Sequence, residues 1–310
     1  TSRQMSGKGV TIAVSLNPLL TMASRSLISS AADSCKNKRS VRARARCRRR
    51  AFVSVSCGVF VIGRSNKVGQ VSLQTAVSLV YPPRCLGCGG QVDSDFGLCG
   101  PCWGATPFIG GAICDTCGTP LPGDDDGDTL KCDDCMVTPR PWTQGRCALL
   151  YKDNARRLVL ALKHGDRQEI AEPAARWIGR VIEDLPLQNA IVAPVPLHWM
   201  RLLKRRYNQS ALLAQALARL TGMPVCPDLL QRQKRTKPLD GLTKELRFSS
   251  VKGAIRVHPR RRHRLAGRPV LLVDDVLTSG ATLSSAADAC LAAGSGPVFV
   301  TALARVAKDA

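Results

Sequence analysis

Two adjacent carboxylates, Asp274 and Asp275, stand between a run of apolar residues and a short turn rich in hydroxyl groups. The apolar run predicts a buried strand over residues 270–275, and the residues after the turn predict a helix over 281–293. A helix N-terminus attracts a phosphate, and ligands of open α/β sheets bind at the carboxyl ends of the strands. Because carboxylates placed there accept hydrogen bonds from a sugar diol, the segment is predicted to bind a ribose 5-phosphate.

The turn supplies the predicted phosphate ligands. These are Thr278, Ser279, Gly280, Ala281 and Thr282, of which three carry hydroxyl donors and Gly280 allows close approach of the backbone. One competing interpretation is the magnesium-binding strand of a P-loop NTPase, which requires a G-x-x-x-x-G-K-[ST] motif that this sequence lacks. The other is a plain strand–turn–helix with a chance acidic pair, which the matching chemistry along the whole segment disfavours.

A second set of residues suited to chemistry is formed by eight cysteines in four Cys-x-x-Cys pairs. Thiolates at such spacings are typical of structural zinc in a tetrahedral site, whereas the cysteine runs of ferredoxins are spaced differently. One or two zinc ions are predicted, and both consecutive and interleaved pairing remain open. The predicted ligands are Cys85, Cys88, Cys99, Cys102, Cys114, Cys117, Cys132 and Cys135.

The net charge of +22 is divided unevenly along the 310 residues. Residues 1–80 carry a net +13, residues 81–147 carry −5 and residues 148–310 carry +14. These blocks predict a disordered basic extension or a mis-assigned start, then a double zinc-ribbon module, then an α/β domain. A basic α/β domain fits a polyanionic ligand, either a phosphorylated small molecule or a nucleic acid, and a solvated basic surface is the plain alternative.

Alternating apolar runs and amphipathic stretches predict the α/β domain. Strands are expected over 148–151, 191–196, 270–275 and 298–304, and helices over 154–163, 168–185, 210–221 and 281–293. This alternation predicts a mostly parallel sheet flanked by helices. The sequence contains no run of 18 or more apolar residues, so no membrane span is predicted, and the zinc-type cysteine pattern favours a reducing cytoplasm.

The segment from Val270 to Thr282 resembles the signature of type I phosphoribosyltransferases. Other motifs resemble the ComF family of competence-related proteins, namely Tyr81–Cys85, Pro194–His198, Arg205–Ser210 and Thr236–Pro238. The resemblance runs from about Tyr81 to Ala307. It implies a type I phosphoribosyltransferase domain that binds phosphoribosyl diphosphate, with Mg²⁺ brought in by the diphosphate.

The resemblance also implies roles for single residues. Asp274 and Asp275 at the reacting centre, with Arg205 neutralising the leaving diphosphate, are the predicted catalytic residues. Arg201 and Lys204 join the predicted ligands of phosphoribosyl diphosphate.

Residues 231–247 correspond in this resemblance to a flexible loop that closes over the reacting centre. The sequence departs from the family pattern at Leu239, where Gln is usual, and at Arg206, where Gly is common.

Three functions are then open. In the first, the chain is an enzyme that transfers a phosphoribosyl group to an unidentified acceptor, as a pentosyl-transferring glycosyltransferase. In the second, it handles single-stranded DNA during DNA uptake together with the competence machinery, and in the third it senses phosphoribosyl diphosphate without catalysis. Thirteen basic residues between Arg232 and Arg268 suit a phosphate backbone, while Phe248 is the single aromatic residue there for base stacking.

Overall fold

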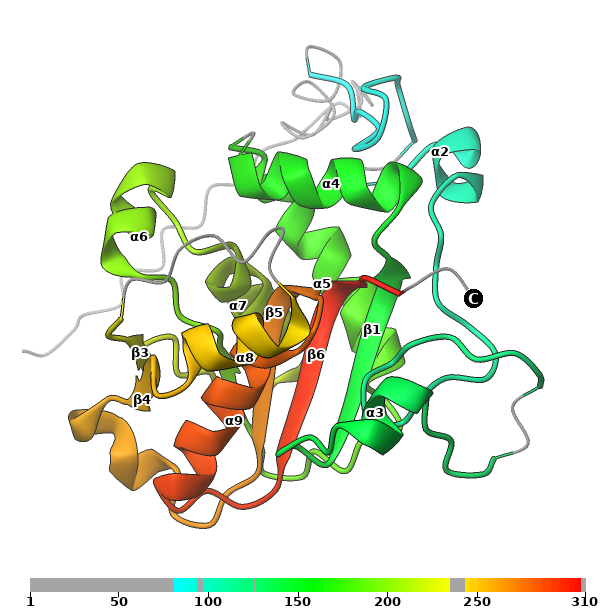
Figure 1. The fold of residues 1–310 in the computed structure, drawn as a ribbon. Helices are drawn as coiled ribbons and strands as arrows, with labels where there is room; N and C mark the ends of the chain where they lie inside the picture. Colours follow the sequence, from blue (N-terminus) through cyan, green and yellow to red (C-terminus); the bar gives the residue numbers. More distant parts are fainter. Residues whose placement is uncertain (1–80, 94–96, 125–126, 165, 235–242, 308–310) are drawn as a thin grey trace, which may run out of the picture. The chain divides into compact units, whose positions relative to one another are not determined.

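The computed structural model describes residues 81–307, apart from 94–96, 125–126, 165 and 235–242 (Figure 1). The predicted extension over residues 1–80 lies outside the described residues. The cysteine-rich module and the α/β domain belong to one compact unit. In the described part of the chain, no helix has the length and apolar character needed to cross a bilayer.

Four parallel strands form the central sheet in the order β1-β6-β5-β2. They are β1 (Gln144–Leu150), β2 (Ile191–Pro194), β5 (Val270–Leu277) and β6 (Val298–Arg305). All eight residues of β6 are buried, as expected for an inner strand of a parallel sheet with both faces covered. The sheet and the cysteine-rich module before it confirm the predicted fold class.

One face of the sheet is covered by three helices, α4 (Asp153–His164), α5 (Ala171–Val181) and α7 (Gln209–Thr221), with the short η1 (Gln168–Ile170) leading into α5. Val192, Leu271 and Val273 point into this layer. Successive strand residues point to opposite faces, so Val270 and Leu272 belong to the second core.

The opposite face of the sheet is covered by α9 (Ala281–Ala292) and by buried cysteines of the N-terminal module. Strand β3 (Leu230–Arg232) pairs antiparallel with β4 (Ile255–Val257) beside this layer. The remaining short elements are α2 (Gly100–Gly104), α3 (Asp133–Val137), α6 (Trp199–Arg205), α8 (Lys244–Val251) and η2 (Pro259–Arg264). In Figure 1, α8 and α9 lie together on one side of β5.

The predicted helix over 168–185 was too long. It begins as a 3₁₀ turn, and its α-helical part ends at Val181. Asp184 leaves the helix to bind the Arg146 guanidinium on β1, with Nε 3.0 Å from the Asp184 Oδ2 atom. Pro186 follows closely, and a proline disfavours helical backbone in the residue before it.

Candidate functional site

The two acidic residues of β5 are held by the start of α7. The Ser210 hydroxyl donates to Asp274 Oδ1 at 2.9 Å, and the Gln209 amide donates to Asp275 Oδ2 at 2.9 Å. Asn208 caps α7 through its side chain, which accepts from the Ser210 backbone N–H, and so fixes the direction in which the helix starts. Both carboxylates therefore have set orientations at the carboxyl half of the strand.

Charge is distributed unequally over this pair. Lys163, near the end of α4, places its Nζ atom 3.2 Å from Asp275 Oδ2. Asp274 has no such ion pair among the described residues. Burial raises the pKa of Asp274 to about 7, and the neighbouring charge of Asp275 acts in the same direction. Asp274 therefore exchanges a proton close to neutral pH.

The predicted phosphate loop lies between β5 and α9. Gly280 has a φ of 80° as the residue before α9, a conformation that side chains rarely adopt. A Cβ atom at this position would lie 3.0 Å from the Trp142 ring and 3.1 Å from Arg140 Nη1. The loop thus requires glycine both for its backbone angle and for its contact with the segment that leaves the cysteine-rich module.

A cavity of about 430 Å³ lies beside the acidic pair and is strongly basic. It is lined by Lys163, His164, Asp166, Arg201, Arg205 and Arg206. The structure therefore brings the predicted Arg201 and Arg205 together, and it adds Lys163, which links the cavity to Asp275. Lys204 lies within α6 between the two arginines, and its side chain lies outside the described set.

Arg206, which stands where glycine is common in the family, lies at the end of α6. It ends α6 with a φ of 66°, in the left-handed region where glycine is favoured. A non-glycine residue in this conformation is strained, and its side chain adds a further cation to the cavity wall.

The predicted flexible loop over 231–247 is ordered at both ends. Its first two residues belong to β3, and its last four belong to α8. Lys237 and Leu239 fall in 235–242, outside the described residues. Burial lowers the pKa of Arg232, the charge of Arg201 adds to this, and Asp274 opposes it. The charge of Arg232 therefore interacts with charges in both parts of the candidate site.

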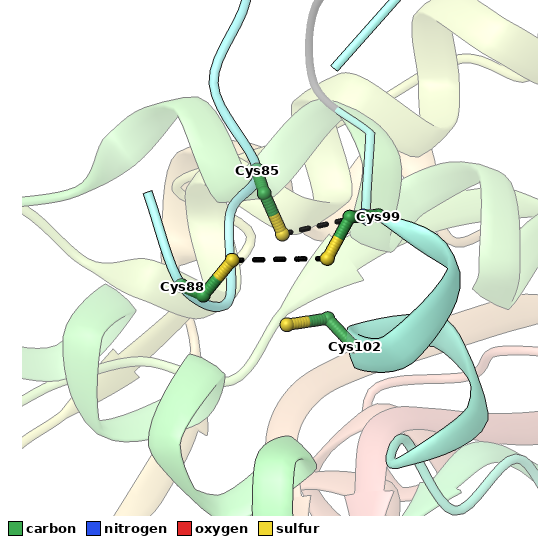
Figure 2. A group of neighbouring side chains, drawn as sticks. All are labelled: Cys85, Cys88, Cys99 and Cys102. Carbon is green, nitrogen blue, oxygen red and sulfur yellow. Dashed lines mark hydrogen bonds between the residues drawn. The ribbon is translucent and has the colours of Figure 1, made fainter. Parts of the chain in front are cut away.

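The first cysteine cluster joins Cys85, Cys88, Cys99 and Cys102 (Figure 2). Its four sulfur atoms lie within 4.8 Å of one another, and those of Cys88 and Cys99 are 3.7 Å apart. Sulfur atoms around a tetrahedral zinc ion, with Zn–S bonds of about 2.3 Å, lie ~3.8 Å apart, so this donor set fits zinc. Cys88 is exposed, and Asn154 at the start of α4 donates to the Cys102 carbonyl at 3.1 Å.

The second cluster joins Cys114, Cys117, Cys132 and Cys135, with the Cys117 and Cys132 sulfurs 3.6 Å apart. Its donor set fits zinc equally well, but three of the four cysteines are buried against the sheet. The structure thus groups the cysteine pairs consecutively, into two separate clusters that each fit one structural zinc ion.

Several residues at the site were missed by the sequence analysis. Lys163, Gln209, Arg140 and Arg305 all contact the acidic pair or the loop. Gln209 belongs to the motif Arg205–Ser210, so its place beside the motif's arginines was a usable signal. The other three have no local signal, because only the packing of distant segments brings them to the site.

Comparison with known proteins agrees with this architecture. A family model described as Double zinc ribbon domain matches residues 76–148. The chain is 32% identical over 218 residues to the DNA utilization protein YhgH of Salmonella typhi, covering 68% of this chain and 92% of that protein. It is 28% identical over 229 residues to Competence protein F of Haemophilus influenzae, covering 72% of this chain and 96% of that protein.

Among solved structures, the glutamine phosphoribosylpyrophosphate (PRPP) amidotransferase from B. subtilis, complexed with ADP and GMP, aligns with 46% of this chain and 30% of its own at 17% identity, with a TM-score of 0.31. The family model covers the cysteine-rich module, and each of the two sequence matches covers more than two thirds of this chain. The chain therefore belongs to the ComF family of competence-related proteins.

Proposed function

We propose that the α/β domain binds phosphoribosyl diphosphate across the acidic pair, the phosphate loop and the basic cavity. One observation carries the proposal. Lys163 lines the arginine-rich cavity and also pairs with Asp275, so a single side chain joins a site for a polyanion to a site for a sugar diol. Phosphoribosyl diphosphate has these two features side by side.

Each part of the ligand has a matching group. The loop over 278–282, at the N-terminus of the twelve-residue helix α9, suits the 5-phosphate. Asp274 and Asp275 retain acceptor capacity for the ribose hydroxyls beyond the hydrogen bonds they already accept. Arg201 and Arg205 face the cavity and suit the diphosphate, because guanidinium groups bind phosphate oxygens through paired N–H groups.

The reaction we propose is transfer of the phosphoribosyl group to an acceptor nucleophile. The bond between C1 of the ribose and the diphosphate oxygen breaks, and its electron pair leaves with the diphosphate. A lone pair of the acceptor forms the new bond to C1. Mg²⁺ bound together with the diphosphate would supply further positive charge to the leaving group. Arg201, Arg205 and Lys163 hold the diphosphate and balance its charge, which is positioning and electrostatic catalysis rather than covalent catalysis.

The test is calorimetric titration of the full chain with phosphoribosyl diphosphate and Mg²⁺, followed by a diphosphate-release assay with a panel of nucleobases. Asp275→Asn is the site variant, and Asp288→Asn, an exposed carboxylate on α9, is the matched control. Binding with release identifies an enzyme, and binding without release identifies a sensing module. Absence of binding by the unaltered chain refutes the proposal.

A second candidate function is the handling of single-stranded DNA. One observation favours it: α6 exposes Trp199 and Leu203, with relative exposures of 60% and 72%, beside the cations of the cavity. Exposed aromatic rings next to basic residues bind single strands by stacking. The relatives named DNA utilization protein and Competence protein F are consistent with such a task.

This candidate predicts that a thymidine oligonucleotide binds the chain with an affinity that falls steeply as salt rises. Trp199→Ala should weaken binding by about 1–3 kcal/mol, because one stacked base is lost. Trp103→Ala removes another partly exposed indole outside α6 and serves as the control. An affinity that does not change with salt, or equal effects of both variants, would exclude this function for α6.

A further inference from the structure

Two arginines hold the backbone of the phosphate loop. Arg305, the last residue of β6, donates from Nη1 to the carbonyls of Leu277 and Thr278 at 3.1 and 2.8 Å. Arg140 donates to the next carbonyl, that of Ser279, at 2.8 Å. Carbonyl oxygens repel an anion and N–H groups attract it. Turning three consecutive carbonyls toward arginines therefore orients this loop for a phosphate.

Arg305 also reaches the second cysteine cluster. Its Nη2 atom donates to the Cys117 sulfur at 3.7 Å, and the side chain is almost fully buried, with 5% exposed. Among the described residues, this guanidinium donates to carbonyl oxygens and to the Cys117 sulfur, so the thiolate is its anionic partner. A buried cation without an anionic partner is unstable. A zinc ion bound by four thiolates carries a net negative charge that supplies this partner.

The guanidinium group is rigid and planar, so its two ends move together. One end is fixed by the second cluster and the other holds the loop. The first cluster has no comparable route to the loop among its described contacts, which lead through Cys102 and Leu86 to Asn154 and Arg167. The two clusters therefore differ in what they hold.

We propose that Arg305 is a positioning residue that couples the second zinc cluster to the phosphate loop. With zinc bound, the Cys117 thiolate keeps the guanidinium in place, and the guanidinium keeps the loop carbonyls turned inward. Loss of zinc from this cluster releases the guanidinium and loosens the loop, whereas loss of zinc from the first cluster does not. The structural part of this inference is independent of the proposed function, and its ligand-dependent part rests on it.

The structural part is tested by hydrogen–deuterium exchange on the full chain without ligand. Arg305→Lys keeps the charge but cannot span the sulfur and two carbonyls. We expect exchange in residues 278–283 to become about tenfold faster, because charge-assisted hydrogen bonds are lost. Arg146→Lys is the matched control, since Arg146 is equally buried and binds Asp115 and Asp184 instead of the loop. Unchanged exchange in Arg305→Lys, or an equal change in the control, overturns the proposal.

A second experiment, which measures the loss of zinc, distinguishes coupling by Arg305 from a role of Arg305 in stability alone. Zinc is withdrawn by a chelator that changes colour on binding it, with and without ribose 5-phosphate. Coupling between two sites is reciprocal in binding free energy, so bound ligand should raise the zinc affinity of the second cluster. We expect the tighter binding to appear as about tenfold slower zinc loss from that cluster, with the first cluster unchanged. In Arg305→Lys this protection should disappear. Cys88→Ser identifies which kinetic phase belongs to the first cluster.

The outcomes separate the two proposals. If calorimetry shows that ribose 5-phosphate does not bind, the proposed function loses its support and the exchange experiment still decides the role of Arg305. If ribose 5-phosphate binds and zinc loss from the second cluster is unaffected, the coupling is refuted and the binding site stands. Should Arg305→Lys not fold, Cys117→His replaces it, because histidine retains zinc and removes the anionic sulfur. Faster loop exchange with two zinc ions retained supports the coupling, and unchanged exchange overturns it.

Discussion

Each of the two cysteine clusters offers four thiolate ligands, but the two clusters lie in different environments. The first has an exposed Cys88 and touches the α/β domain at the start of α4, through Asn154. The second is part of the core on the face of the sheet that α9 also covers, with Arg305 reaching from β6 to one of its sulfurs. Ligand chemistry alone therefore does not define the task of a zinc site. The first cluster secures a helix, and the second forms part of the wall behind the phosphate loop.

The largest expected difference between the clusters is in stability. Cys114→Ser should remove zinc from the second cluster and lower the free energy of unfolding by on the order of 5 kcal/mol, because structural zinc contributes strongly to folding. Cys88→Ser should cost clearly less, since that thiol is exposed. Zinc content and guanidinium unfolding under reducing conditions measure both. Equal losses of unfolding free energy in the two variants would contradict the proposed difference between the clusters.

The next largest effect is expected for a substitution in the proposed ligand site, which contacts neither cysteine cluster. Asp275→Asn removes the charge that pairs with Lys163 and should weaken binding of phosphoribosyl diphosphate by about 1–3 kcal/mol. The zinc content should remain at two ions per chain. Calorimetry gives the first quantity and metal analysis the second. An unchanged affinity would contradict the assignment of Asp275 to the site.

A smaller effect distinguishes the contacts that lie behind each cluster. Asn154→Ala loses hydrogen bonds to the Cys102 carbonyl and to Thr106, and should cost about 1–2 kcal/mol of stability while leaving ligand affinity unchanged. Arg140→Ala loses the hydrogen bond to Ser279 and should weaken ligand binding by about 1 kcal/mol. Unfolding curves and calorimetry on both variants test the pattern. The reverse pattern would mean that the first module supports the loop.

The smallest effect concerns pH and Asp274. Its pKa in the folded chain, about 7, exceeds the ordinary value of 3.8, so the folded state binds more protons between these values. The stability contributed by the protonated carboxyl is present at low pH and is lost as pH rises through about 7. Between pH 6 and 7.5 the unaltered chain should lose about 1 kcal/mol relative to Asp274→Asn. Taking the difference between the two proteins cancels the effect of acid on zinc binding. A stability difference between the two proteins that does not vary with pH would contradict the raised pKa of Asp274.

Much of the fold was predictable because local patterns encode it. The strand and helix around Asp274 and Asp275 were expected at nearly their observed bounds, with β5 continuing to Leu277. The sequence named all eight cysteines that the structure gathers into two clusters, but their pairing was left open because spacing does not specify which pairs meet. Elements β3, β4 and α8 were missed because each is short and, unlike the strands of the parallel sheet, carries no continuous apolar run.

The site was predictable only in part. Arg201 and Arg205 could be inferred because they stand in a recognisable motif, and the structure places them on one cavity. Lys163 and Arg305 could not be inferred, since each reaches the site from a segment whose own sequence is ordinary for a helix or a strand. Their function depends on long-range packing, which a single sequence does not reveal.

The position of β6 affects how the chain folds during synthesis. This strand is the last in the described part of the chain, yet it lies between β1 and β5 and pairs with both. On the ribosome, β1 and β5 remain without their shared neighbour until residue 305 has emerged. Parallel pairings between distant segments form slowly, and unpaired apolar strands aggregate. The cysteines of both clusters are all synthesised before β1, so zinc can bind and cross-link this segment during this interval.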